Sequence, residues 1–153
     1  MTKKITFCAA ACALSLVLLM LTNILPFNTV VLICAATLLF PLARIKCGGK
    51  YAAIAVLAAV ILSFIFLPDK LLWAEFSLLA AYSVLKGSIE KRRKIGSEIL
   101  IKAIIYIVGL SAILKIFTNH ISIILLLIGI PVFIIYDIFL TFFIGYAIRK
   151  MPF

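Results

Sequence analysis

The chain has 153 residues, of which 67% are hydrophobic and 13% are charged, and its formal net charge is +10. A soluble domain carries about 25% charged residues, so this composition excludes an ordinary soluble domain and indicates an integral membrane protein. The 15 basic residues lie at the ends of apolar segments rather than along one face, which argues against a nucleic-acid-binding surface. The four cysteines contain no C-x-x-C pair and predict no disulfide framework.

The apolar segments predict an all-α bundle of about six transmembrane helices in a single domain, residues 1–153. Residues 5–43 carry no charge over 39 positions, about twice the ~20 residues that one helix needs to cross a bilayer, so the chain must turn inside this run. The polar residues 23–28 mark that turn, and Pro41 bends or ends the second segment. The predicted spans are residues 5–25, 29–43, 51–67, 71–85, 98–117 and 121–148.

The two ends of the chain each leave an alternative open. The last segment has 28 residues, about 42 Å if wholly helical and too long for one straight crossing, so the sixth span begins either at Ile121 or near Pro131. The first segment also looks like a signal peptide. Its 21 apolar residues exceed the about 7–15 of a signal-peptide core, and no small-residue cleavage site precedes Pro26, so we expect a retained helix.

Basic residues predict how the bundle is oriented in a cell membrane. Twelve of the fifteen lie in four stretches, residues 3–4, 44–50, 86–94 and 149–150, whereas the opposite side has only Lys70 in its loops. Short loops rich in Lys and Arg stay on the cytoplasmic side of a membrane. We therefore expect both termini to be cytoplasmic in a multi-pass protein of a bacterial inner membrane.

Five polar residues interrupt the apolar segments, and each needs an explanation, since an Asp or Lys at a helix centre costs about 2.5–3.5 kcal/mol on insertion scales. They are Glu75, Lys102, Lys115, His120 and Asp137. We expect Lys102 and Lys115 to extend their ammonium groups to the lipid headgroups at the two ends of their helix. Glu75 either forms an ion pair with Lys115 or lines a pocket that opens outward.

The depth of Asp137 depends on where the sixth span begins. If it begins near Pro131, Asp137 lies about 9–10 Å below the outer surface, level with Glu75 and within reach of Lys115. If it begins at Ile121, Asp137 lies past mid-depth and is tied to polar groups of the cytosolic side. The first alternative predicts a site for a small-molecule ligand near the outer leaflet. Its residues are Glu75, Lys115, Asp137, His120, Tyr136 and Thr141.

Motifs for catalysis are absent from the sequence. It contains no G-x-S-x-G, H-E-x-x-H or phosphate-binding G-x-x-x-x-G-K-[ST] pattern, and it has a single histidine and no paired carboxylates. Cys8 and Cys12 share one helical face, but no histidine or carboxylate joins them, so we interpret them as small residues at a helix contact rather than metal ligands. We expect no catalytic residues, no bound metal and no cofactor.

Small residues recur at a spacing of four along the first segment, in the pairs Cys8/Cys12 and Ala9/Ala13. Such a surface lets another helix approach closely, either within the bundle or from a partner protein. With about six spans, internal termini, a basic start and this first helix, the chain resembles the substrate-binding S components of energy-coupling-factor (ECF) vitamin transporters.

That resemblance implies a function in uptake of a small molecule such as a vitamin. In the family, the alanine motif of the first helix docks on a transmembrane coupling subunit, and the matching positions here are Ala9 and Ala13, with Cys8 and Cys12 beside them. Separate ATPase subunits supply the energy, and the ligand binds near the outer leaflet. The chain is also similar to the rod-shape-determining MreD family of membrane scaffolds, which would need no ligand and would make the polar residues structural.

Overall fold

A computed structural model describes residues 2–25, 28–89, 95–118 and 123–150, and within these residues the secondary structure is helical, without strands. The prediction of an all-α fold is confirmed. In chain order the helices are α1 (Thr2–Ile24), α2 (Thr29–Thr37), α3 (Leu39–Cys47), α4 (Gly49–Phe66), α5 (Lys70–Ile89), α6 (Ile95–Thr118) and α7 (Ile123–Lys150).

Several of these helices have the length and apolar composition of membrane spans. Among the described residues, four stretches qualify: Thr2–Ile24, Thr29–Cys47, Gly49–Phe66 and Gly129–Lys150. Helix α6 adds a shorter apolar stretch, Ile101–Ile113, whereas α5 is not in the set. The fold is therefore compatible with a membrane protein, and the count of six spans and the cytoplasmic position of the termini stay predictions.

The second predicted span is a helical run with a break, and Pro41 explains where the break falls. Helix α2 ends at Thr37 and α3 begins at Leu39, so Pro41 lies in the first turn of α3. Proline has no N–H for the carbonyl four residues earlier, here Thr37, and its ring clashes with that carbonyl. The expected bend is present, and the helical run continues four residues beyond the predicted end at residue 43, to Cys47.

The basic loop predicted at residues 44–50 is in fact a one-residue break. Only Gly48 separates α3 from α4, with φ 98° and ψ 162°, a conformation that essentially only glycine adopts without strain. Arg44 consequently lies inside α3, where it is half-buried and its guanidinium donates a hydrogen bond to the Val84 carbonyl of α5. This cation contacts a neighbouring helix instead of lying in a loop.

The turn predicted at residues 68–70 is confirmed, since α4 ends at Phe66 and α5 begins at Lys70. Asp69 caps α5, because its carboxylate accepts a hydrogen bond from the Leu71 N–H at 2.9 Å. Lys70 caps α4 in turn, as its Nζ donates to the carbonyls of Phe64 at 2.6 Å and Leu67 at 3.1 Å. The residues of this turn thus satisfy backbone groups at the start of α5 and at the end of α4.

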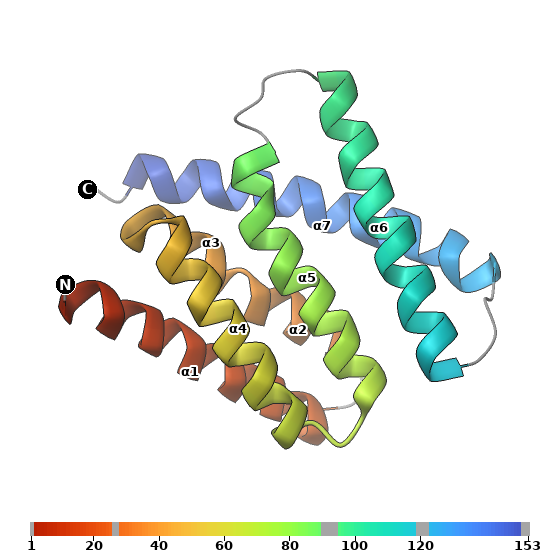
Figure 1. Ribbon diagram of the computed structural model, residues 1–153, viewed down its shortest axis with the longest axis horizontal. Helices are drawn as coiled ribbons and strands as arrows, with labels where there is room; N and C mark the ends of the chain where they lie inside the picture. The colour runs from red at the N-terminus through yellow and green to blue at the C-terminus, as the bar shows by residue number, and fades with distance from the viewer. Residues whose placement is uncertain (1, 26–27, 90–94, 119–122, 151–153) are drawn as a thin grey trace.

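Small side chains form much of the core between α1, α2, α3 and α4. Four alanines of this core are fully buried: Ala36, Ala43, Ala52 and Ala59. Their size allows the backbones to approach closely, and the larger Phe40 and Leu19 fill the remaining space. Figure 1 shows α1, α4 and α5 running alongside one another, with α7 crossing behind α5 and α6.

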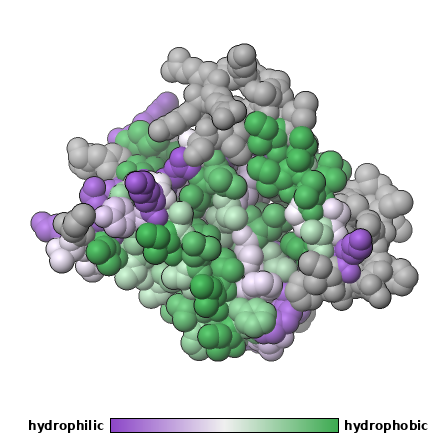
Figure 2. Space-filling view, viewed as in Figure 1, coloured by the Kyte–Doolittle hydropathy of each residue, from purple (hydrophilic) through white to green (hydrophobic). Residues whose placement is uncertain are grey.

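Polar residues gather at one end of the molecule. Figure 1 places the start of α1, the junction of α3 and α4 and the end of α7 at the same end. In the same view, hydrophobic residues cover the middle of the face, and hydrophilic residues lie mainly toward that end, with smaller groups on the opposite side (Figure 2). This distribution agrees with a bundle whose apolar middle lies in lipid, and the side of the membrane that each end faces stays a prediction.

The last three helices differ most from the predicted boundaries. Helix α5 continues to Ile89, so Lys86 is a helical residue rather than the first residue of a loop at 86–94, of which residues 90–94 lie outside the described residues. Helix α6 begins at Ile95, before the predicted residue 98. Helix α7 begins at Ile123 and continues through Pro131, so Pro131 lies within a helix, and the residue at which the sixth span begins stays a prediction.

Candidate functional site

Helices α5 and α7 meet at a buried ion pair between Lys86 and Asp137. The Lys86 side chain is 0% exposed. Its ammonium forms a salt bridge to Asp137 Oδ1 and also donates hydrogen bonds to the Asp137 carbonyl at 2.7 Å and to the Thr141 hydroxyl at 2.6 Å. Tyr82, one turn before Lys86, donates its hydroxyl to the same Oδ1. A buried charge is tolerated only when it is paired in this way.

A second lysine reaches Asp137 from α6. Lys102 Nζ lies 3.0 Å from Asp137 Oδ2, and the exposed fractions of the two side chains are 14% and 19%. The expectation that Lys102 extends to the headgroups is therefore wrong. Its ammonium satisfies a carboxylate inside the bundle instead, so Asp137 connects α5, α6 and α7.

The continuous course of α7 explains why Asp137 meets these lysines. Asp137 lies 14 residues after Ile123, about 21 Å along the helix, and is therefore near its middle. Whether Asp137 lies past mid-depth of the membrane and is tied to the cytosolic side, as the alternative with a start at Ile121 predicts, stays a prediction. The expected reach to Lys115 is wrong, because Lys115 lies 13 residues, about 20 Å, beyond Lys102 on α6.

The other predicted site residues are distributed over the bundle. Thr141 belongs to the ion cluster, whereas Tyr136 is buried and shares a 2.8 Å hydrogen bond with the Thr37 hydroxyl of α2. Glu75 is half-buried on α5, and Lys115 is exposed near the end of α6. No ion pair joins Glu75 to Lys115 in the described structure.

His120 lies outside the described residues. The structure thus brings Asp137 and Thr141 together, and it does not assemble the predicted outer group as one cluster. Whether these residues bind a substrate stays a prediction.

A cleft opens beside the ion cluster, between α6 and α7. Its volume is about 320 Å³, the lower end of the ~300–1,000 Å³ of small-molecule sites. Lys102 and Asp137 form its charged part, and the remaining lining is aromatic or aliphatic. The rings of Tyr106 and Phe133 lie 4.8 Å apart in the wall. Ligand sites usually have this composition, a mainly apolar cleft with a few polar groups.

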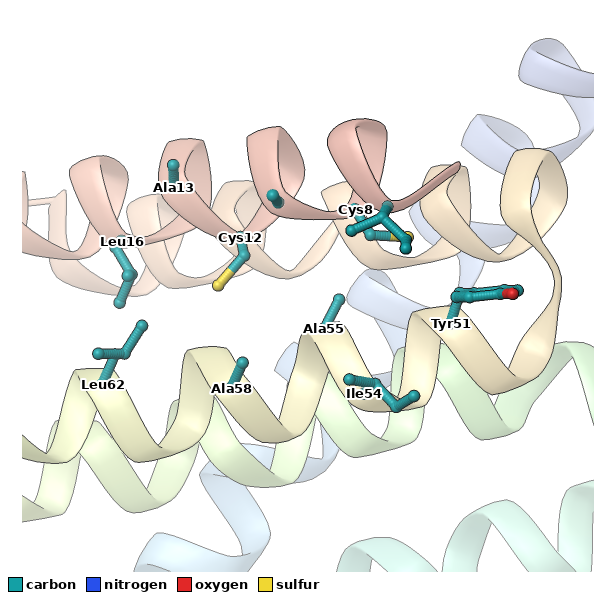
Figure 3. Close-up of a pocket in the computed structure, with 11 residues that line it drawn as sticks. Cys8, Cys12, Ala13, Leu16, Tyr51, Ile54, Ala55, Ala58 and Leu62 are labelled. Carbon is teal, nitrogen blue, oxygen red and sulfur yellow. The ribbon is translucent and has the colours of Figure 1, made fainter. Parts of the chain in front are cut away.

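A second, wholly apolar groove lies between α1 and α4. It has a volume of about 530 Å³, and its lining includes the predicted docking residues Cys8, Ala9, Cys12 and Ala13. Cys8 and Cys12 are buried, whereas Ala9 and Ala13 are exposed. Figure 3 shows the Cys12 side chain pointing toward α4, and Leu16 and Leu62 facing each other across the groove.

The sequence reasoning missed Tyr82 and Lys86 as members of the cluster. The signal that identifies them is a pair of i, i+4 spacings, Tyr82 with Lys86 and Asp137 with Thr141. Residues four apart share one face of a helix, so each pair presents two polar groups to the same neighbour. Two such faces on separate apolar helices predict a contact between those helices. This prediction includes Lys86, although it borders a basic stretch.

Comparisons with known proteins identify no relative: no family model, no curated protein and no solved structure matches the chain. Assignment of function therefore depends on the ion cluster, the cleft beside it and the groove between α1 and α4.

Proposed function

We propose that this protein is a membrane-embedded binding subunit for uptake of a small molecule, energised by separate coupling and ATPase subunits. The observation that carries the proposal is the Lys102–Asp137 ion pair, which forms the charged part of an otherwise apolar cleft between α6 and α7. An ion pair in such a cleft can exchange a partner for a charged group of a ligand. The proposal assigns binding, and no catalysis, to these residues.

The groove between α1 and α4 supports a second part of the proposal, the docking of a coupling subunit. Ala9 and Ala13 are exposed along this groove, and Ala55 and Ala58 lie across it on α4. Small side chains on both walls let a partner helix approach closely in lipid. Cys8 and Cys12 would form part of the floor under that helix.

A melting experiment tests ligand binding directly. The full chain is purified in detergent, the co-purified small molecules are identified, and the melting temperature is measured with and without them. We expect Lys102→Gln to reduce the ligand-dependent rise and Glu75→Gln to leave it, since Glu75 lies outside the cleft lining. Lys115→Gln is the matched control, because Lys115 is an exposed lysine of the same helix and lies outside the cleft lining.

The second candidate function is a membrane scaffold without a ligand. It is favoured by one observation, that Asp137 already accepts hydrogen bonds from Tyr82, Lys86 and Lys102. Absence of any co-purified or stabilising molecule, together with a lowered melting temperature for Asp137→Asn that no added molecule restores, would support the scaffold. Co-purification of a coupling subunit that is lost on Ala9→Leu or Ala13→Leu would support the transporter.

A further inference from the structure

We propose that the cleft between α6 and α7 binds an amphipathic monocarboxylate that enters sideways from the hydrocarbon region of the membrane. This inference rests on the proposed function and names the class of its ligand. Lys102 would hold the carboxylate, and the aromatic and aliphatic wall would hold the apolar body.

The sign of the ligand's charge follows from how the two charged groups of the cleft are held. Asp137 Oδ1 is fixed from behind by Lys86, which is fully buried, and by Tyr82. Only Oδ2 faces Lys102. A lysine has a flexible four-carbon stem, so its ammonium can change partners more easily than a carboxylate held on two sides. The exchangeable group is thus a cation, and its complement is an anion.

Exchange of this partner leaves no buried charge alone. When a ligand carboxylate takes the place of Asp137 Oδ2 on Lys102 Nζ, Asp137 keeps Lys86 as its ion-pair partner. A cationic ligand would instead have to compete with Lys86 and Lys102 together for one carboxylate. A singly charged group also fits better than a phosphate dianion, because burying a second charge in apolar surroundings is costly.

The rim of the cleft indicates the route and the body of the ligand. Ile107, Ile134 and Ile138 line the cleft and are 52%, 51% and 51% exposed. They lie on helices whose apolar stretches suit lipid, so the rim faces hydrocarbon in a bilayer. The lining on α7 extends from Ile130 to Ile138, a separation of eight positions or about 12 Å along the helix. A ligand that fits this shape is mainly apolar and has one acidic end.

A binding experiment on the full chain in lipid nanodiscs tests the inference. The probe is a long-chain fatty acid with a fluorophore at its tail, and the comparison ligand is the methyl ester of the same molecule. We expect the acid to bind at least about tenfold more tightly than the ester, as one charge-assisted hydrogen bond would produce. Equal affinity of acid and ester would overturn the proposal.

Two pairs of variants locate the probe. Lys102→Gln should weaken binding of the acid about tenfold, and Lys115→Gln, an exposed lysine on the same helix, should not. Ile134→Trp should fill the cleft without touching the ion cluster, whereas its exposed neighbour Ile135→Trp lies outside the lining and should bind normally. The second pair keeps the test valid if Lys102→Gln does not fold. Unchanged binding in Ile134→Trp would contradict the site.

Two further measurements separate the possible failures. Raising the phosphatidylglycerol content of the nanodisc should not displace the probe, and displacement would show that the cleft holds a lipid phosphate instead. If the probe does not bind but a co-purified molecule still raises the melting temperature and Lys102→Gln reduces that rise, the monocarboxylate class is wrong and the binding function stands. If neither binds, both proposals fail.

Discussion

Helices α1 to α4 and helices α5 to α7 are joined by different kinds of contact. The first group packs through small residues, and its fully buried positions include Ala36, Ala52 and Ala59. The second group meets at Asp137, which pairs with Lys86 of α5 and Lys102 of α6. One region therefore depends on the fit of apolar surfaces, and the other on charge.

This difference matters because lipid supplies no hydrophobic driving force between helices. Close packing of small residues has one good arrangement and changes little with its surroundings. A charged side chain can exchange one ion-pair partner for another and stay paired throughout. The structure thus combines a part held together by apolar packing with a part held together by charge.

The largest expected effect breaks the charged region at its centre. Asp137→Leu should lower the free energy of unfolding by about 3–5 kcal/mol, because Lys86 stays fully buried without its carboxylate. Unfolding in mixed micelles with increasing sodium dodecyl sulfate measures the change. The double variant Lys86→Met/Asp137→Leu should recover part of the loss, since it removes the buried charge of Lys86 together with the carboxylate, although Lys102 also loses Asp137. A double variant as unstable as the single one would contradict this account.

A smaller effect tests the packing of the first region. Ala59→Leu should cost about 1–3 kcal/mol, because Ala59 is fully buried in the core between α1, α3 and α4 and a leucine overfills that space. The matched control is Ala53→Leu on the exposed side of the same helix, which should be close to neutral. The same unfolding assay compares them. Equal losses for the two variants would show that helix propensity rather than close packing is measured.

A hydrogen bond between the two regions allows a finer measurement. Tyr136 of α7 and Thr37 of α2 share a buried bond of 2.8 Å between their hydroxyls. A double-mutant cycle with Tyr136→Phe and Thr37→Val should give a coupling of about 0.6 kcal/mol, the average for such bonds between membrane helices. A coupling indistinguishable from zero would mean that α7 is attached to the rest of the bundle only by the ion cluster and apolar contact.

The smallest effect concerns a polar group that contributes nothing. Ser15 Oγ is buried on α1 and has no hydrogen-bond partner in the part of the chain that the structure describes. Ser15→Ala removes this unsatisfied group, so the free energy of unfolding should stay the same or rise by up to about 1 kcal/mol. A clear loss of stability would reveal a partner for this hydroxyl and weaken the contrast between the two regions.

Much of the fold follows from the sequence because lipid restricts what a chain can do. A helix is the form in which an apolar segment satisfies its own backbone, so the apolar runs alone predict an all-α protein. The break before Pro41 and the turn before Lys70 follow from prolines at positions 41 and 68, each of which removes a backbone hydrogen bond. Residues 44–50 were predicted as a loop because charge there was weighed above helix propensity, although a single glycine suffices for the turn.

The candidate site was less predictable, for a physical reason. Lys86 borders a strongly basic stretch, and composition alone cannot distinguish a lysine in solvent from one paired with a carboxylate 51 residues later. From the sequence alone, a lysine near a helix end is expected to extend to the headgroups, because this expectation needs no information about the neighbouring helices. The depth of Asp137 depended on whether Pro131 ends a helix or lies within one, and the structure has it within α7.

The distance in sequence between Lys86 and Asp137 has a consequence for how the protein is made. Helix α5 leaves the ribosome well before α7, so Lys86 must wait for its carboxylate while the chain grows. We expect the fourth segment to settle fully in the membrane only after the last one arrives. Chains stopped after residue 118 should then leave position 86 open to a water-soluble thiol reagent in a Lys86→Cys variant whose four native cysteines are replaced by serine, and completed chains should protect it.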